Sequence, residues 1–522
     1  MISIKPVIAG LLISILYLPA RHVYSILSFH LSPLPKPFSD PDFISTSSLS
    51  PLRQVRTTTI FSNSNQTTSF DQSDYDRFAF CEDAIVYKLD GGEREVGILS
   101  CDPTRWEWNT VMGTLVNPRA GKGALWVLDP VESEVIQIKL DWNENPSLEQ
   151  DFHPLGIDIY PCSIPGGSDT LFVINHRAEE STVEVFNLSC SASLDCVASH
   201  LRSLSHPSFS GAPNSFAAVS PTSFYLSHDH RFNLRTSSRL KKLLNSFETL
   251  LALPLSYVDF VTFTSPSISS VSSTEIAVSR AMSRIAFANG IVLSPSGKTL
   301  AIASTTVRSV FLCSRNLVTN TLSSKPYRII KLPFLVDNLS VSPFKFLNKQ
   351  NGSPSAVAKN PERSSDKVQV SEKEEEDRFE LIATGHPSFF HLLATAHQSP
   401  PFSLSSLLST PLNHLPLPES FKELVKSKLK VWFRNWEFDW KETRGLSWSV
   451  SIPNPPSQSS EKEWESLFMS SGKKKRDEGG YGSSSTTILG ESLVGRGEGE
   501  KRKRWVIVAG LYEEGAKVVV EE

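Results

Sequence analysis

The sequence predicts an all-β protein, and within that class a β-propeller. From about residue 78 onward, short apolar runs recur and are separated by turn-forming Pro, Gly, Ser and Asp residues. Few stretches between them have the period of an amphipathic helix, and strands at this spacing are typical of sandwiches, barrels and propellers. An internal repeat favours the propeller, because a sandwich is not expected to reuse one hairpin with a polar residue at the same place.

The repeat consists of a polar residue, a short strand, a turn of the Ser-Pro type and a second strand. It begins at Asn214, at Asn289 and at Asp337–Asn338, and residues 155–176 follow the same plan with a longer turn. Pro and Gly reverse the chain, and the β-branched runs beside them suit a pleated sheet. The starts at 214, 289 and 337 lie 75 and 48 residues apart, which is compatible with blades joined by unequal loops.

The N-terminus indicates the secretory pathway. Residues 7–18, VIAGLLISILYL, form an apolar run of 12 between Lys5 and Arg21. This is the length of a signal-peptide core and is short of the roughly 20 residues that a spanning helix needs. Because no cleavage site is obvious, residues 1–29 are predicted to be a signal peptide or a signal-anchor. The protein is therefore expected to be secreted, or to associate with a membrane through this segment.

In the secretory pathway cysteines can form disulfides, and N-x-S/T motifs can be glycosylated. None of the six cysteines has C-x-x-C metal spacing. Cys190 and Cys196 are close enough in the sequence to form a local disulfide, although the sequence does not establish it. The candidate N-glycosylation sites are Asn65, Asn187, Asn338 and Asn351.

Differences in composition divide the rest of the chain into a lead-in, a propeller and insertions. Residues 30–77, rich in Ser, Thr and Pro, are predicted to be a low-complexity lead-in to a propeller over 78–522. Three stretches are predicted to be insertions between strands: about 350–378, 398–420 and 455–504. With 52 Lys and Arg against 55 Asp and Glu, the net charge of -3 argues against a nucleic-acid partner.

Polar residues at matching places in the repeats predict a metal site. These residues are Glu82–Asp83, Asn214, Asn289 and Asp337–Asn338. The inner strands of a propeller begin at its central channel, so equivalent positions of different blades are expected to converge. Carboxylate and amide oxygens suit Ca²⁺, and the lack of His and Cys in the set disfavours Zn²⁺. The alternative is that each Asn only caps a strand or turn.

No other catalytic pattern competes with this site. The sequence contains no G-x-S-x-G, H-E-x-x-H, Walker or G-x-G-x-x-G motif. Glu82 and Asp337 supply two negative charges, while the asparagines supply only dipoles. A bound Ca²⁺ would thus be neutralised without surplus charge and could still polarise a substrate oxygen.

These motifs resemble the paraoxonase/arylesterase family. The similar segments, in the same order, are FCEDAIVY, HPLGIDIY, LFVINH, STVEVFNL, NSFAAVSPTSFYLSHDHRF, FANGIVLSPSGKTLAIAS and LVDNLSV. They run from about 78 to 343, and the resemblance resumes at 383–390 and weakens towards the strands at 505–520. It implies a six-bladed propeller with two calcium ions in its tunnel that hydrolyses aryl esters, lactones and some organophosphate triesters. Ring closure is expected to pair the strand around 506–520 with the N-terminal region.

The resemblance also assigns calcium ligands. The catalytic ion would be held by Glu82, Asn214, Asn289, Asp337 and Asn338, all of which are present. For the second, structural ion, Asp83 and the backbone carbonyl of Ile157 match the family. The Asp that usually completes this site is Ser215 here, and a hydroxyl carries no charge. The second site is therefore expected to be weak or lost.

The family's histidine dyad is incomplete in this chain. His176 matches its second member, but Leu155 stands at the first, and His153 lies two residues earlier. Asp229–His230 and His386 match a D-H pair and an H-P pair of the family. For each histidine, a packed or solvent-facing role is the alternative to a catalytic one. The family's C-terminal cysteine is also absent.

The sequence thus predicts a Ca²⁺-dependent hydrolase of small aryl esters or lactones. Ca²⁺ would polarise the carbonyl, and Glu82, Asp337 or His176 would activate water. The alternative is a non-catalytic propeller in which calcium is a structural clamp and the surface binds a partner. Leu155 favours the alternative, and the intact set of five ligands favours the enzyme.

Overall fold

A computed structural model describes most of the chain from residue 78 onward. The described residues are 25–26, 34–40, 43, 45–47, 55–60, 78–343 except 90–91, 119–120, 144–145, 165, 211 and 265–274, then 377–397, 446–456, 463–472, 481–494 and 501–521. The predicted signal segment at 7–18, the insertion at 398–420 and nearly all of the insertion at 350–378 lie outside these residues.

The first three blades are built mainly from consecutive strands. The first blade contains β3 (Cys81–Leu89), β4 (Arg94–Cys101), β7 (Ala124–Asp129) and β8 (Glu134–Gln137). The second contains β10 (Pro154–Tyr160), β11 (Asp169–His176), β12 (Ser181–Cys190), β13 (Cys196–Leu204) and, at its outer edge, β9 (Lys139–Asp141). The third contains β14 (Pro213–Ser220), β15 (Ser223–His228), β16 (Ser256–Phe263) and β17 (Ile276–Ile285).

The other three blades continue the same order, and two of them recruit a strand from the N-terminal region. The fourth blade contains β18 (Ala288–Leu293), β19 (Thr299–Ser304), β20 (Ser309–Ser314) and β21 (Arg328–Lys331). The fifth contains β22 (Leu335–Ser342), β23 (Phe379–His386), β24 (Ser447–Asn454), β25 (Glu465–Ser470) and β1 (Ser45–Ser47). The sixth contains β26 (Ser484–Val494), β27 (Lys501–Gly510), β28 (Ala516–Glu521) and β2 (Val55–Ile60).

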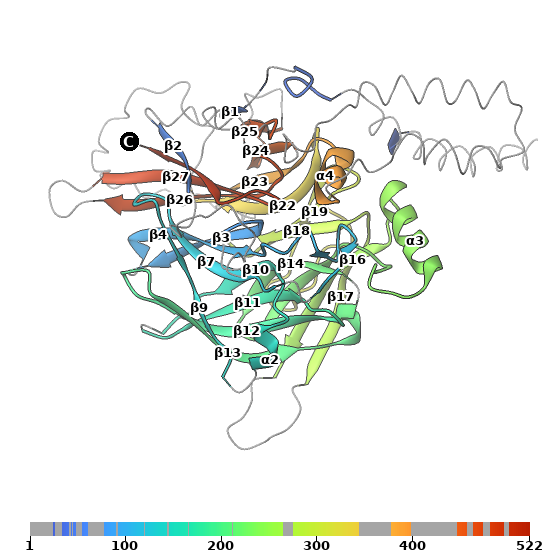
Figure 1. The fold of residues 1–522 in the computed structure, drawn as a ribbon, viewed down its shortest axis with the longest axis horizontal. Helices are drawn as coiled ribbons and strands as arrows, with labels where there is room; N and C mark the ends of the chain where they lie inside the picture. Colours follow the sequence, from blue (N-terminus) through green and yellow to red (C-terminus); the bar gives the residue numbers. More distant parts are fainter. Residues whose placement is uncertain are drawn as a thin grey trace, which may run out of the picture.

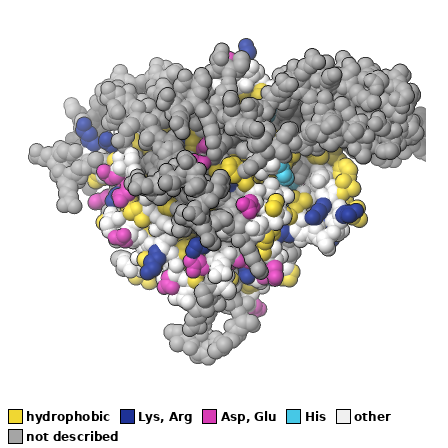
Figure 2. Space-filling model, in the orientation of Figure 1, with side chains coloured by type: hydrophobic (Ala, Val, Ile, Leu, Met, Phe, Trp, Pro, Cys, Tyr) yellow, Lys and Arg dark blue, Asp and Glu magenta, His cyan; other side chains and the backbone are white. Residues whose placement is uncertain are grey.

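Shorter elements connect the blades. They are the two-stranded β5 (Trp108–Asn109) and β6 (Thr114–Leu115), α2 (Pro146–Glu149), η3 (Pro207–Ser210), α3 (Arg239–Leu250) and α4 (Phe389–Ala396). Helix α3 stands at the edge of the molecule and α4 follows β23 (Figure 1). Acidic and basic side chains are interspersed over the face shown in Figure 2, in keeping with the near-zero net charge. In the described part of the chain, no helix has the length and apolar character to cross a membrane.

The six sheets close into a ring, so the predicted six-bladed propeller is confirmed. Neighbouring inner strands, from β3 through β10, β14, β18 and β22 to β26 and back to β3, contact each other all the way round. Strand β2 pairs antiparallel with β28, with Val55 opposite Glu521 and Ile60 opposite Ala516. The N-terminal region thus supplies the outermost strand of the C-terminal blade, as ring closure predicted.

Apolar side chains form the contact between each pair of neighbouring blades. Six large clusters of buried residues lie at the six blade interfaces. At the junction that closes the ring, for example, Trp126 of the first blade packs in one cluster with Trp505 of the sixth. Burial of apolar area stabilises the folded state by about 25 cal/mol per Å². The packed interfaces therefore hold neighbouring blades together and fix the positions of the inner strands at the axis.

Two disulfides link neighbouring strands. Cys190–Cys196 joins β12 to β13, which confirms a pairing that the sequence left open. Cys81–Cys101 joins β3 to β4, and its two residues are directly opposite in the ladder. The second pairing was not predicted, since 20 residues separate the two cysteines.

The structure differs from the sequence prediction in two segments. Residues 455–504, expected to be an insertion, include β25 and the inner strand β26. The lead-in at 30–77 supplies β1 and β2. Strand β26 escaped prediction because its buried residues are polar. Thr486 Oγ1, for example, donates to the Glu82 carbonyl at 2.9 Å, so hydroxyls replace the apolar alternation that marks a strand.

Candidate functional site

All six inner strands carry an irregularity near their start. There the ladder to the next strand shifts register, at Cys81/Asp83, Pro154/Ile157, Pro213/Phe216, Ala288/Ile291, Val336/Leu339 and Ser484/Thr486. A bulge of this kind bends the strand and re-aims a side chain. The skipped residues include Glu82, Asn214, Asn289 and Asp337–Asn338. The polar positions recognised in the repeats are therefore equivalent positions of the fold.

Two glycines let these strand starts come together. A Cβ at Gly156 on β10 would lie 2.3 Å from the Asn214 carbonyl oxygen, and one at Gly290 on β18 would lie 2.5 Å from the Asn338 Cα. Contacts this short exclude a side chain at either position. Glycine beside the axial residues thus lets neighbouring strands approach closely.

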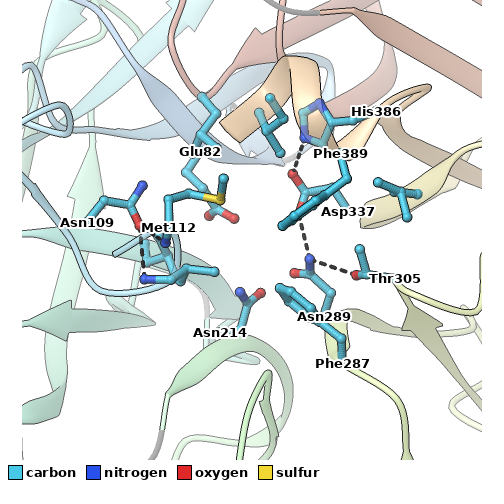
Figure 3. A pocket seen from close by; sticks show the side chains of 15 residues that line it. Glu82, Asn109, Met112, Asn214, Phe287, Asn289, Thr305, Asp337, His386 and Phe389 are labelled. Atoms are coloured by element: carbon cyan, nitrogen blue, oxygen red, sulfur yellow. Dashed lines mark hydrogen bonds and ion pairs between the residues drawn. The ribbon is translucent and has the colours of Figure 1, made fainter. Parts of the chain in front are cut away.

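Four of the predicted ligands line one cavity at the centre of the ring. Glu82, Asn214, Asn289 and Asp337 come from four different blades, and their side chains point into a common space of about 520 Å³ measured out to its mouth (Figure 3). None of the four is more than 8% exposed. The structure therefore brings these residues together as the repeat predicted.

Three oxygens of this group lack a hydrogen-bond partner among the described residues. They are Glu82 Oε2, Asn214 Oδ1 and Asn289 Oδ1. Buried polar atoms are nearly always hydrogen-bonded, and leaving one unpaired costs about 1–3 kcal/mol. Unpaired oxygens from three blades that face one cavity match the hard-oxygen donors that Ca²⁺ binds. The residues present therefore fit a calcium ion.

Asp337 orients its neighbours in the cavity. Its Oδ1 accepts a hydrogen bond from Asn289 Nδ2 at 2.7 Å, and its Oδ2 lies 2.9 Å from His386 Nε2. Asn289 Nδ2 also donates to Thr305 Oγ1 at 3.1 Å. With its nitrogen bonded on this side, Asn289 turns its unpaired oxygen towards the cavity (Figure 3).

The electrostatics of the site favour a bound cation. Burial, with the nearby carboxylates of Asp83 and Asp337, raises the pKa of Glu82 well above its usual value. Burial likewise raises the pKa of Asp83 to about 7. Carboxylates crowded in a dry place repel each other and disfavour ionisation, and a divalent cation among them reverses this effect.

Asn338 lies behind the cavity wall. Its Nδ2 donates to the Glu82 carbonyl at 3.1 Å, to Glu82 Oε1 at 3.2 Å and to Thr486 Oγ1 at 2.9 Å. In this arrangement Asn338 positions Glu82 through its amide nitrogen. Its assignment as a calcium ligand stays a prediction.

The residues predicted for a second ion are already engaged with protein groups. Asp83 accepts hydrogen bonds from the backbone N–H groups of Ala84 and Ile157, both at 2.9 Å. Ser215 Oγ accepts from the Ile291 N–H at 3.3 Å. Within the described ranges, no group of three or more His, Cys, Asp and Glu side chains is placed to hold a metal ion. The candidate site found here combines carboxylates with amides.

His176 does not line the cavity, although it was predicted as a catalytic residue. Its Nε2 donates to the Pro213 carbonyl at 2.7 Å, and its Nδ1 lies 2.5 Å from Thr110 Oγ1. Burial, with the positive charge of Arg235, lowers the pKa of His176 to about 3. The ring is therefore neutral and both of its nitrogens are occupied. Leu155, at the family's other histidine position, does line the cavity.

Sequence reasoning identified His386 only as a motif match and missed the apolar wall of the cavity. His386 lines the cavity beside Asp337, and its Nδ1 has no partner in the part of the chain that the structure describes. The wall residues follow no motif, because they come from loops and helix α4 as well as from strands. They are Val111, Met112, Leu155, Phe287, Leu335, Phe389, Leu392 and Leu511.

Comparison with known proteins finds relatives over part of the chain. Residues 117–348 match the family model described as Arylesterase. Human serum paraoxonase/arylesterase 1 is 29% identical over 227 residues, which cover 44% of this chain and 56% of that protein. The mouse protein of the same name is 27% identical over 253 residues, covering 48% and 59%. The matched part thus spans little more than half of these relatives.

A solved structure of a luciferin-regenerating enzyme aligns with 85% of this chain and 92% of its own, at 9% identity and a TM-score of 0.36. This similarity is too low to support an inference. The family model and the curated relatives confirm the resemblance to the paraoxonase/arylesterase family that the sequence motifs indicated.

Proposed function

We propose that this chain, a relative of the paraoxonase/arylesterase family, is a calcium-dependent hydrolase of small aryl esters or lactones. The observation that carries the proposal is a group of three oxygens next to Asp337 that have no hydrogen-bond partner among the described residues. They face a cavity whose remaining wall is mostly apolar. The oxygens suit a cation, and the apolar wall suits the aryl or acyl part of an ester.

The ion would be held by Glu82, Asn214, Asn289 and Asp337, with Asn338 as the remaining predicted ligand. When bound, Ca²⁺ supplies Lewis-acid polarisation of the ester carbonyl. Side chains of the chain itself position the substrate and accept the proton of the attacking water. Phe287 and Phe389 on the apolar wall hold the organic part of the substrate and exclude bulk water, which strengthens electrostatic interactions in the cavity.

Glu82 is the proton acceptor that we propose for the attacking water. Its Oε1 is held by Asn338 at 3.2 Å, while its Oε2 is unpartnered among the described residues. His386 Nδ1, which also has no hydrogen-bond partner in the described ranges, is a second base at the cavity, and Asp337 holds its ring in place. We do not assign this role to His176, because both of its ring nitrogens have hydrogen-bond partners.

We predict that His176→Gln lowers kcat/KM for an aryl ester by about tenfold. His176 supports the Pro213 carbonyl, directly before Asn214, so its loss disturbs a ligand without removing one. Steady-state kinetics of this variant and of Glu82→Gln check the assignment. A His176→Gln protein that binds calcium normally but has no activity would identify histidine as the base.

We also predict that each chain binds one calcium ion tightly. The second position lacks a carboxylate at Ser215, and Asp83 is already satisfied by N–H donors. Isothermal titration calorimetry should give a stoichiometry near one ion. Ser215→Asp should add a second, weaker binding event, whereas two tight ions in the unmodified protein contradict the prediction.

Leu155 favours the alternative function, a non-catalytic propeller stabilised by calcium. It replaces a histidine of the family motif with an apolar side chain in the cavity wall. In that case calcium would raise stability, and no ester or lactone would be hydrolysed.

We propose further that the chain passes through the secretory pathway, by cleavage of residues 1–29 or by anchorage through them. The two disulfides support this, since such bonds persist in oxidising compartments. Asn187 is exposed on β12 and is accessible to glycosylation, whereas Asn338 is 3% exposed and therefore unsuited to it. Asn65 and Asn351 lie outside the described residues.

A further inference from the structure

A second group of side chains near the cavity has the arrangement of a nucleophile, a base and an orienting carboxylate. Asp229 Oδ1 lies 2.8 Å from His230 Nδ1, and His230 Nε2 lies 2.6 Å from Thr249 Oγ1. The carboxylate places the proton on Nδ1, so that Nε2 can accept the proton of the Thr249 hydroxyl. Both distances fall within the hydrogen-bond reach, about 2.6–3.2 Å, of activated nucleophiles.

Thr249 faces a cavity that continues from the calcium cavity. This smaller cavity has a volume of about 240 Å³ measured out to its mouth. The two cavities share the wall residues Phe287, Thr305, Leu335 and Phe389. Thr249 is partly exposed, unlike His230 and Asp229. Thr249 therefore lines a pocket that adjoins the cavity proposed for the ester.

Thr306 gives an independent indication of a ligand. It lines the same small cavity and is only 3% exposed. Its Oγ1 has no hydrogen-bond partner within the described residues. A buried hydroxyl in this state is a donor for an oxygen that enters the cavity, such as the carbonyl oxygen of an ester.

Hydrogen bonds hold helix α3 against the loop that carries His230. Asn245 Nδ2 donates to the Phe232 carbonyl at 2.5 Å, and Glu248 accepts from the backbone N–H of Arg231 at 2.8 Å. Thr249 Oγ1 also lies 3.2 Å from the Asn245 carbonyl, farther than from His230. Burial by itself lowers the pKa of His230, but the Asp229 carboxylate outweighs it and raises this pKa, which keeps the ring basic.

We propose that Thr249, His230 and Asp229 form a second, metal-independent acyl-transfer site for small activated esters. The Thr249 oxygen bonds to the carbonyl carbon as its proton passes to His230 Nε2. The bond from that carbon to the leaving oxygen breaks, and the proton departs with the alcohol. Water then adds to the acyl carbon and gives one proton to His230 Nε2. The bond from the acyl carbon to the Thr249 oxygen breaks, and His230 returns the proton to that oxygen. The products are the alcohol and a carboxylic acid.

The test uses the purified full-length protein, p-nitrophenyl acetate and an excess of calcium chelator. Mass spectrometry of the intact protein and of its peptides should find one acetyl group on Thr249. Thr249→Val keeps the side-chain shape without the hydroxyl and should lose the label, while Thr249→Ser should keep it. His230→Gln should slow labelling by at least about tenfold. The matched control is Ser246→Ala, because Ser246 on the same helix also bonds a carbonyl one turn earlier, at 3.2 Å from Lys242 O, and should not change the label.

The chelator separates this proposal from the calcium-dependent function. Acetylation of Thr249 under chelation supports the second site even if no calcium-dependent hydrolysis is found. Acetyl groups confined to lysines, or labelling of Thr249 that His230→Gln leaves undiminished, overturn the proposal. If Thr249→Val fails to fold, the rates of Thr249→Ser and His230→Gln decide the outcome.

Discussion

Asp337→Asn is expected to lower kcat/KM for aryl esters and lactones by at least about 100-fold. The variant keeps the shape of the side chain but removes one of the two negative charges at the cavity. It also replaces two acceptor oxygens by one, so the side chain can accept a hydrogen bond from only one of Asn289 and His386. Calcium affinity, measured by isothermal titration calorimetry, should fall in parallel. Unchanged affinity and kinetics would place the functional site elsewhere.

Two asparagines of the cavity provide a matched comparison for this prediction. Asn214 Oδ1 has no hydrogen-bond partner among the described residues, whereas Asn109 Oδ1 accepts from the N–H groups of Val111 and Met112 at 3.0 and 2.9 Å. Asn214→Ala should therefore remove the rise in Tm that calcium produces, with little loss of Tm in chelator. Asn109→Ala should lower Tm in chelator and keep the calcium-induced rise. Equal losses of calcium binding in both variants would contradict the assignment.

Asp102→Asn is expected to reduce the free energy of unfolding by about 3–5 kcal/mol. Asp102 Oδ2 lies 2.8 Å from His153 Nδ1, and both side chains are 2% exposed. His153 Nε2 also donates to the Pro118 carbonyl at 2.8 Å. Neutralising the carboxylate removes the nearest counter-charge of the buried His153, since Asp151 Oδ1 lies farther away, at 3.9 Å from Nε2. Urea denaturation measures the loss, and Asp195→Asn on the surface is the control, expected to change stability by less than about 0.5 kcal/mol.

The pH dependence of this loss follows from the two pKa shifts. Burial lowers the pKa of His153, but Asp102 outweighs burial and raises it above 6.5. Burial raises the pKa of Asp102, but His153 outweighs it and lowers it below 3.8. The ion pair therefore contributes its full free energy of stabilisation between pH 3.8 and pH 6.5, the ordinary pKa values of the two groups. This contribution is lost as the pH rises through the raised pKa of His153. The gap between wild type and Asp102→Asn should narrow at alkaline pH, and a gap that widens there would contradict the ion pair.

The sequence was informative where function and fold constrain the same residue. Asn214, Asn289 and Asp337 recur at strand starts because the bulges of the inner strands direct these positions to the axis. Apolar runs separated by turns then identify the blades, and the match of the N-terminal region to the last blade follows from ring closure. These features are local or periodic, so they can be read from a single chain.

Other features depend on three-dimensional contacts that no local pattern records. Strand β26 is polar because Ser485, Thr486 and Thr487 find partners on neighbouring strands. The Cys81–Cys101 disulfide depends on the register of two strands. His176 matches a family motif, yet the carbonyl of Pro213 and the hydroxyl of Thr110 occupy its ring. Only the folded chain shows which partners a polar residue has.

The most direct measurement is hydrolysis of a panel of aryl esters and lactones by the purified full-length protein during a calcium titration. To separate any contribution of Thr249, the titration is repeated with Thr249→Val. In Thr249→Val we expect turnover to be absent in chelator and to rise with calcium along the same curve as calcium binding. Adding Asn214→Ala to this variant should remove both responses. Calcium that binds and stabilises without turnover of any substrate would make the site a structural clamp. Turnover that chelator leaves undiminished in Thr249→Val would contradict a calcium-dependent hydrolase.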